Sequence, residues 1–120
     1  MQKRAIVLFA HGSRDPLWRR PVEAVAQRML VLDPAVLVCC AYLEMMEPDL
    51  PTAARKLVTG GANRITVVPM FLGVGRHARQ DLPKLMKALK QEHRQISFHL
   101  QQAIGEHHRV VDLLAEIALT

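Results

Sequence analysis

The feature that most constrains the fold is an alternation of short apolar runs with segments of helical periodicity. Four runs are rich in branched and other apolar residues, which is typical of strands in a core. The segments after them repeat apolar residues three and four positions apart, as amphipathic helices do. The strand-like runs are Ala5–Phe9, Val36–Leu43, Ile65–Met70 and Ile96–Leu100, and the apolar helical positions span Val22–Leu30, Leu50–Val58, Leu82–Leu89 and Val110–Ala118. This order predicts an α/β fold with a four-stranded parallel sheet flanked by helices in three layers, because parallel strands need crossover connections.

Turn and capping residues mark where several of these elements end. Asp33-Pro34 stops the first helix, Asp49 caps the start of the second, and Gly60-Gly61 closes it. The fourth strand alternates apolar residues with Ser97 and His99, which predicts a half-exposed strand at the sheet edge. With 120 residues and no linker or internal repeat, the chain is expected to form a single domain over residues 1–120.

The charge balance indicates an anionic partner. Sixteen Lys and Arg residues stand against 11 Asp and Glu, a formal net charge of +5. Nucleic acid, a phosphate compound or a small polycarboxylate would each fit this balance. Nucleic acid is the weakest of these, because the basic residues are scattered and the few aromatic residues do not interleave with them.

Membrane association and disulfide bonding are not expected. No apolar run approaches the roughly 20 residues that cross a bilayer, and the amino terminus lacks a signal-peptide pattern. Cys39 and Cys40 are neighbours on a predicted strand and would point to opposite faces, so they are expected to be free thiols. These observations predict a cytoplasmic protein with no membrane contact.

Three ionisable residues follow the first three strands, at the edge where open parallel sheets bind ligands. His11 follows the first strand, Glu44 the second, and His77 lies in the loop after the third. If these strands are neighbours, the three side chains can converge on one cleft. Two imidazoles and a carboxylate suit a divalent Co²⁺, Fe²⁺, Ni²⁺ or Zn²⁺ ion, and they also suit acid–base catalysis. Taken alone, each of these residues is more often an ordinary surface residue than a ligand, and it is their joint placement at one edge of the sheet that favours a site.

Residues beside the same loops are candidates for binding an anion. Arg14, Arg76 and Arg79 have the guanidinium geometry that pairs with carboxylates, although they could equally be solvated loop charges. Gly12, Gly73 and Gly75 would let the backbone turn tightly or approach a ligand, although glycines in loops usually serve only the turn. The other four histidines are expected to lie outside the site: His93 and His99 facing solvent, and His107 and His108 starting the last helix without sharing a face.

Several nucleotide-binding and hydrolase motifs are absent. The chain has no Gly-x-x-x-x-Gly-Lys-Ser/Thr run and no Gly-x-Ser-x-Gly elbow, and the loop after the first strand is not Gly-x-Gly-x-x-Gly. Ala10 precedes His11-Gly12, where a histidine phosphatase would carry Arg-His-Gly.

Three segments carry a family resemblance that extends over nearly the whole chain. They are Leu8–Pro16 with its His-Gly-Ser-Arg turn, Ala41–Glu44, and the long run Val68–Pro83. Together they resemble the short sirohydrochlorin chelatases of the CbiX type, which insert metal without ATP. The resemblance implies a parallel sheet flanked by helices, equivalent to one half of a two-lobed chelatase, and a homodimer in which two subunits replace the two lobes.

The resemblance also implies a reaction and a site. The reaction is insertion of a divalent metal into sirohydrochlorin with release of two protons, and it needs no cofactor beyond the substrate metal. Cobalt, used in cobalamin (vitamin B12) biosynthesis, is favoured, with iron for sirohaem or nickel as alternatives. His11, Glu44 and His77 would bind the metal and carry the catalysis, and Ser13, Arg14, Gly73, Gly75, Arg76 and Arg79 would bind the substrate. A non-catalytic metal or tetrapyrrole carrier and a phosphate-binding regulatory module remain alternatives. The chain lacks the histidine-rich tail of some relatives.

Overall fold

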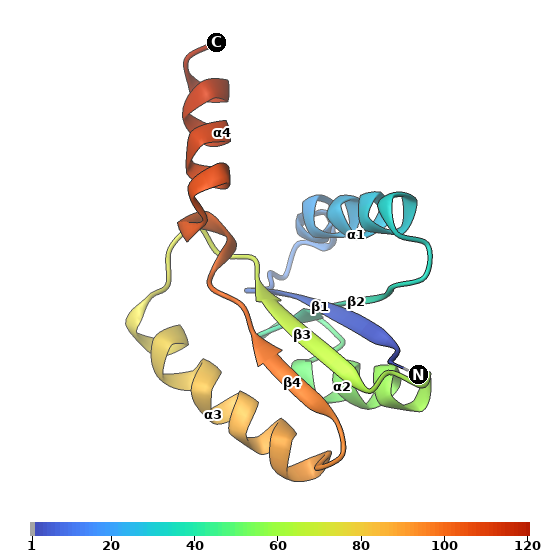
Figure 1. Cartoon of the computed structure of the whole chain (residues 1–120). Coiled ribbons are helices and arrows are strands. Elements are labelled where there is room, and N and C mark those ends of the chain that lie inside the picture. The colour runs from blue at the N-terminus through green and yellow to red at the C-terminus, as the bar shows by residue number, and fades with distance from the viewer. Residues whose placement is uncertain (1) are drawn as a thin grey trace.

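A computed structural model describes residues 2–120 and shows a four-stranded parallel sheet with helices on both faces (Figure 1). The strands are β1 (Arg4–Ala10), β2 (Leu37–Tyr42), β3 (Arg64–Pro69) and β4 (Ser97–Leu100). The helices are α1 (Arg20–Leu32), α2 (Leu50–Thr59), α3 (Arg76–Glu92) and α4 (His108–Ala118), with short 3₁₀ turns η1 (Pro16–Arg19) and η2 (Ile104–Glu106). The predicted alternation of strands and helices is confirmed.

The strand order is β2-β1-β3-β4, and every neighbouring pair is parallel. The edge position predicted for the fourth strand is confirmed, and Phe98 on it is buried while Ser97 and His99 are exposed. β1 lies between β2 and β3, so the first three strands end side by side. This placement brings the segments after them to one edge of the sheet.

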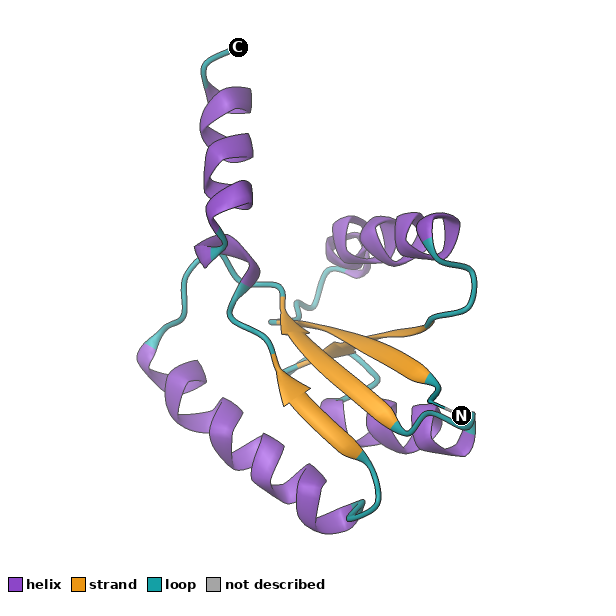
Figure 2. Ribbon diagram, in the orientation of Figure 1, coloured by secondary structure: helices purple, strands orange, loops and turns teal. Residues whose placement is uncertain are grey.

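The pleat of β1 divides the core into two clusters on opposite faces. Val7 and Phe9 point toward α2 and α3, where they pack with Leu57 and Leu89. Leu8 and Ala10 point to the other face, where α1 covers them from the side of β2. Figure 2 shows α1 on one side of the sheet and α2 with α3 on the other. The continuous apolar run of β1 is explained by this two-sided burial.

The start of α3 differs from the prediction. The apolar spacing Leu82–Leu89, with Asp81 and Pro83 just before and after its first residue, predicts a helix that starts near Asp81. The helix instead begins at Arg76, and Arg79 N–H already donates to the Gly75 carbonyl at 3.0 Å. The sequence does contain a sign of this earlier start: Ala78, which is buried, lies one helical turn before Leu82 and extends the apolar face of the helix. His77 therefore lies in the first helical turn and not in a loop.

Two histidine predictions are wrong. The side chain of His93 is only 12% exposed, because it packs against Phe98 with the ring centroids 6.0 Å apart. His107 and His108 do start the last helix, but their rings stack at 4.7 Å, since His107 is the extended N-cap residue and not part of the helix. His99 is exposed, as predicted.

The remaining local predictions agree with the structure. Asp49 caps α2 by accepting a hydrogen bond from Thr52 N–H at 2.9 Å, and Gly60 is the residue after the helix. Cys39 and Cys40 are free thiols. Across residues 2–120, no helix combines the length and apolar character needed to span a bilayer.

Candidate functional site

His11 and Glu44 follow adjacent parallel strands and lie side by side. Ala10 and Tyr42 are register partners at the ends of β1 and β2, and the pairing continues past them. Leu43 N–H donates to the Ala10 carbonyl at 2.9 Å, and Glu44 N–H donates to the His11 carbonyl at 3.1 Å. The two side chains meet at the carboxyl edge of the sheet, with His11 Nε2 3.9 Å from Glu44 Oε1. This part of the predicted convergence is present in the structure.

A close backbone contact at Gly12 holds the two loops together. Gly12 has a φ of 102°, and a Cβ on it would overlap the Glu44 carbonyl group. The chain turns sharply directly after Glu44, where Met45 has a φ of 65° and Met46 N–H donates to the Glu44 carbonyl at 2.8 Å. Only glycine fits the first of these positions, because it alone combines a positive φ with no side chain.

Phe71 supports the imidazole of His11. It is 7% exposed, and its ring meets that of His11 edge-on with centroids 5.7 Å apart. Phe71 also contacts Phe9 at 6.3 Å, so it anchors the imidazole to the core. Sequence reasoning treated Phe71 as an ordinary loop residue, since nothing local marks it. The contact exists only because β1 and β3 are neighbours in the sheet.

The structure does not gather His77 with the other two residues. His77 is exposed in the first turn of α3, and no group of three His, Cys, Asp or Glu residues within positions 2–120 is arranged to hold a metal ion. α3 starts earlier than predicted, so His77 lies on a helix and not in the predicted loop after β3. In this conformation two of the three predicted ligands are adjacent.

The His11–Glu44 pair has the separation that two ligands of one ion require. Imidazole nitrogen and carboxylate oxygen bind a divalent transition metal at about 2.0–2.2 Å, so two such ligands stand at most about 4.4 Å apart. The observed 3.9 Å lies within this limit. The His11 and Glu44 side chains are 58% and 52% exposed, which leaves the other coordination positions open to incoming groups. Open coordination positions are characteristic of catalytic metal sites, in which a substrate or water occupies the free position.

A groove of about 1120 Å³ begins at Glu44 and continues beside α2. We call it the β2–α2 groove; it is lined by Arg19, the segment Tyr42–Asp49, and Thr52, Arg55, Lys56 and Thr59. Arg19 stacks over the Tyr42 ring at 5.6 Å. Burial raises the pKa of the Tyr42 hydroxyl above its ordinary value. Sequence reasoning missed the basic residues of this groove, because only the packing of η1 and α2 beside β2 brings Arg19, Arg55 and Lys56 together there.

The predicted substrate-binding residues lie in two segments near the carboxyl edge. Ser13 Oγ accepts a hydrogen bond from Asp15 N–H at 3.1 Å, so it also shapes the turn after β1. Arg14 in that turn is exposed, as are Arg76 and Arg79 on α3. A Cβ on either Gly73 or Gly75 would meet nothing within 4 Å, so no contact within residues 2–120 requires glycine there.

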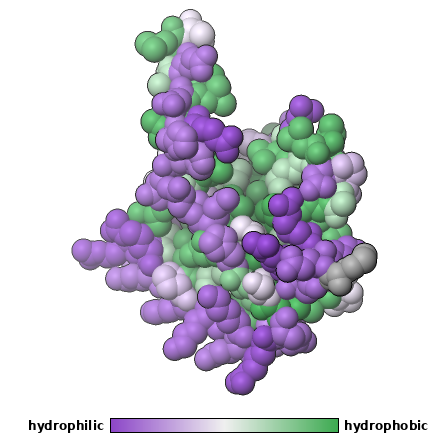
Figure 3. All heavy atoms as spheres, viewed as in Figure 1, coloured by the Kyte–Doolittle hydropathy of each residue, from purple (hydrophilic) through white to green (hydrophobic). Residues whose placement is uncertain are grey.

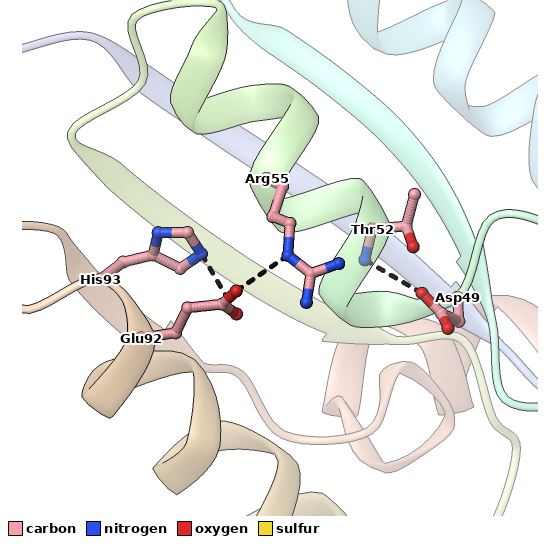
Figure 4. Close-up of polar contacts among 5 residues, drawn as sticks. All are labelled: Asp49, Thr52, Arg55, Glu92 and His93. Atoms are coloured by element: carbon pink, nitrogen blue, oxygen red, sulfur yellow. Dashed lines mark hydrogen bonds and ion pairs between the residues drawn. The ribbon is translucent and has the colours of Figure 1, made fainter.

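A second polar cluster joins α2 to the end of α3 (Figure 4). Arg55 Nε donates to Glu92 Oε1 at 2.8 Å, and His93 Nε2 lies 3.5 Å from the other carboxylate oxygen. The hydrogen bond from Arg55 holds the pKa of Glu92 below its ordinary value. This cluster is a structural tie between two helices on the same face of the sheet.

Comparison with known proteins places these features in a family. The CbiX family model matches residues 5–119. A sirohydrochlorin cobaltochelatase from Methanopyrus kandleri is 37% identical over 82 residues, 68% of this chain and 57% of that protein. The matches to this and three other methanogen relatives span only 57% to 62% of the length of those proteins.

Two solved structures share the fold over almost the whole chain. A putative cobalamin (vitamin B12) biosynthesis CbiX protein from Marinobacter aquaeolei VT8 superposes with a TM-score of 0.82 at 32% identity, covering 97% of this chain and 94% of the other. The sirohydrochlorin chelatase SirB from Bacillus subtilis subspecies spizizenii, in complex with cobalt, also gives 0.82, at 26% identity, covering 98% of this chain but 50% of SirB. The sequence match, the shared sheet and the motif residues at its carboxyl edge agree: this chain belongs to the CbiX family.

Proposed function

We propose that this protein inserts Co²⁺ into sirohydrochlorin without ATP, releasing two protons, as a step of cobalamin biosynthesis. Membership of the CbiX family and the likeness to proteins named sirohydrochlorin cobaltochelatases support the reaction. The observation that carries the proposal is the exposed His11–Glu44 pair, with its donor atoms 3.9 Å apart at the carboxyl edge of the sheet.

In the proposed mechanism the substrate metal first binds between His11 Nε2 and Glu44 Oε1. The ring nitrogens of sirohydrochlorin then take the open coordination positions, and the ion moves from the protein to the macrocycle. Half-exposed ligands favour this transfer, because a site with few protein ligands releases its metal more readily than a closed structural site. As the metal leaves, the Glu44 carboxylate and the His11 imidazole are free to accept the two protons displaced from the ring nitrogens.

His77 is proposed as the third metal-binding and catalytic residue. It lies in the first turn of α3, after a segment that contains Gly73 and Gly75. A Cβ on either glycine would meet nothing within 4 Å, so there is open space beside the backbone at both positions, although Val74 between them packs against the core. A shift of the first turn of α3 toward His11 would complete the set when metal and substrate bind.

The substrate-binding role is assigned to Ser13, Arg14, Gly73, Gly75, Arg76 and Arg79. The exposed guanidinium groups of Arg14, Arg76 and Arg79 would pair with carboxylates of the tetrapyrrole. The open space at both glycines would let a flat macrocycle lie close to the backbone. The formal net charge of +5 favours such an anionic substrate.

The proposal includes assembly as a homodimer in which residues 1–120 form one lobe. SirB supports it, because this chain superposes on half of that longer protein. A second copy would then take the place of the other half, as two subunits in place of two lobes.

An anaerobic absorbance time course tests the proposed reaction. Catalytic amounts of protein are mixed with excess sirohydrochlorin and Co²⁺, Fe²⁺ or Ni²⁺ in separate cuvettes, each against a blank without protein. Many turnovers above the blank are expected, with the highest kcat/KM for cobalt. A spectral change that stops at one equivalent of metal per site would mean that the protein is a carrier and not an enzyme. A higher kcat/KM with Fe²⁺ or Ni²⁺ would mean that cobalt is not the preferred metal.

The matched variants are His11→Ala and His99→Ala. Both remove an exposed imidazole, but His99 lies on the edge strand β4 and not at the carboxyl edge beside Glu44. We expect a rate loss of about 100-fold or more for His11→Ala, the size typical of losing an acid–base or ligand group. His99→Ala should keep the wild-type rate, and equal rates for the two variants would contradict the assignment of His11.

A further inference from the structure

Met45 is a large apolar residue that lies exposed next to a proposed metal ligand. Most of the other exposed large apolar side chains belong to helices, and in Figure 3 they gather on the flank of α4 and around α1. Met45 instead lies in the loop after β2, directly behind Glu44, and it is 58% exposed. The roles proposed above leave this side chain without a function.

The backbone at Met45 has a conformation that side chains rarely adopt. Its φ is 65°, in the left-handed region that favours glycine. Met46 N–H donates to the Glu44 carbonyl at 2.8 Å, which closes a three-residue turn with Met45 at its centre. A turn of this kind with a positive central φ is rare and strained. Glycine would relieve the strain, so the chain keeps a side chain here despite its effect on the backbone, as is common where a residue contacts a ligand.

The loop that carries Met45 is fixed at its base and on one side. Tyr42 N–H donates to the Pro48 carbonyl at 2.9 Å, which ties the two ends of the loop together. Met46 packs against the core cluster that contains Tyr42. Met45 therefore projects from an anchored turn, and its position next to Glu44 is set by the fold.

The surroundings of Met45 combine an apolar contact with an open metal site. Met45 and Glu44 both line the start of the β2–α2 groove. Met45 belongs to neither of the two core clusters formed by the described residues. Its thioether chain is flexible and polarisable, so it adapts to an apolar surface of irregular shape. A flat macrocycle whose nitrogens approach the metal presents such a surface beside the ion.

We propose that Met45 is a substrate-contact residue that packs against the face of the tetrapyrrole ring and holds the ring over the His11–Glu44 pair. The inference rests on the proposed function and deepens it. The guanidinium groups assigned above recognise carboxylates at the rim of the ring, and they would pair equally well with the carboxylates of a flexible molecule. The contact with Met45 recognises the flat conjugated face, and so selects a macrocycle among polycarboxylates.

The first test is binding of sirohydrochlorin in the absence of metal, followed by absorbance, to wild type and to three variants. Met45→Gly and Met45→Ala both remove the side chain, but only glycine relieves the positive φ. Met45→Leu keeps an apolar side chain of similar size. We expect the Kd to rise about 5-fold to 10-fold for Gly and Ala alike, because burial of the exposed part of the side chain is lost. Leu should keep the Kd within about 2-fold of wild type.

The outcomes separate this inference from the proposed function. A wild type that binds sirohydrochlorin and inserts metal, with a Met45→Gly variant of unchanged Kd, would overturn the inference alone. A raised Kd for Met45→Ala but not for Met45→Gly would assign the effect to the backbone and overturn it as well. A wild type that binds no sirohydrochlorin would overturn the proposed function together with the inference.

The second test asks whether Met45 acts on the substrate or on Glu44. Titration with Co²⁺ alone should give the same Kd for wild type and all three variants, because Met45 does not ligate the ion in the proposal. Met45→Gly should unfold at a higher temperature than Met45→Ala, since glycine accepts the positive φ. Weaker Co²⁺ binding by Met45→Gly would mean that the side chain positions the metal ligand, and it would overturn the assignment to the substrate.

Discussion

The two faces of the sheet differ in how completely helices cover them. On one face α2 and α3 close a core in which Phe9, Ile65 and Leu89 are at most 2% exposed. On the other face α1 covers only the side toward β2, and α1 and α4 leave large apolar residues in solvent, among them Leu32 at 70% and Ile117 at 60%. The difference indicates that the packed core on the face with α2 and α3 contributes most of the stability of the single chain.

The sharpest test of this difference is the same substitution on both faces. Leu89→Ala removes a side chain that is 2% exposed between α3 and the sheet, and we expect it to lower the free energy of unfolding by about 2–5 kcal/mol. Leu32→Ala removes an exposed side chain at the end of α1 and should change it by no more than about 0.5 kcal/mol. Urea denaturation of both variants measures this. Equal losses of unfolding free energy would show that the face with α1 contributes as much to stability as the face with α2 and α3.

A second prediction concerns the carboxyl edge, where the close approach at Gly12 fixes the distance between His11 and Glu44. Gly12→Ala would push the two loops apart, because the new Cβ overlaps the Glu44 carbonyl. We expect chelatase activity to fall by about 100-fold, the cost typical of an ångström-scale misplacement. Gly60→Ala is the control, since Gly60 has an ordinary φ of −75° at the end of α2 and a Cβ there would meet nothing closer than 3.4 Å. If both variants keep full activity, the backbone contact does not position the pair.

A third prediction concerns the Arg55–Glu92 ion pair, which joins α2 to α3 and should make the stability of the protein depend on pH. Because the Arg55 hydrogen bond lowers the pKa of Glu92, the ion pair stabilises the folded chain above the ordinary carboxyl pKa of 4.5. The stabilisation decreases as the pH falls below 4.5, and it is lost once the pH is below the lowered pKa of Glu92 in the folded protein. Glu92→Gln should remove this part of the acid dependence and leave the other carboxyl groups unaffected.

Unfolding curves of wild type and Glu92→Gln at several pH values between neutral and strongly acidic measure the effect. The two proteins should differ most near neutral pH and converge in acid. The difference should be small, because both side chains are largely exposed to solvent. A constant difference at all pH values would mean that the carboxylate charge is not the cause.

The smallest predicted effect is on the rate at which Cys39 and Cys40 react with an alkylating reagent. Burial in the protein raises the pKa of the Cys39 thiol and raises that of Cys40 to about 11. Few thiolates exist at neutral pH, so alkylation of the folded protein should be slower than that of the same protein in denaturant. Mass spectrometry of alkylation over time measures both rates. Equal rates in the two states would contradict the burial of these groups.

The local sequence predicted most of the architecture and half of the site's geometry. The four strands and the Asp49 cap follow from the spacing of residues within each segment, and these predictions are confirmed. The adjacency of His11 and Glu44 follows from their positions at the ends of two parallel strands. The start of α3 was misjudged because Pro83 is more typical of a first turn, and this error moved His77 from a helix into a loop.

Long-range contacts account for what sequence reasoning missed. Phe71 against His11, Gly12 against the Glu44 carbonyl and Gly105 against Leu72 each join segments that only the crossovers bring together. The burial of His93 and the groove between α1 and β3 likewise depend on how the helices pack on the sheet.

The sequence by itself determined the class of fold, the edge of the sheet where chemistry can occur, and the residues that the family motif places there. These features depend on periodicity and on residue type, which are local. The tertiary structure decided which of the motif residues meet, how open the His11–Glu44 pair is, and that no residue of the amphipathic helix α4 is buried. Those features depend on distances between segments far apart in the chain, and such distances are set by the packing of whole elements.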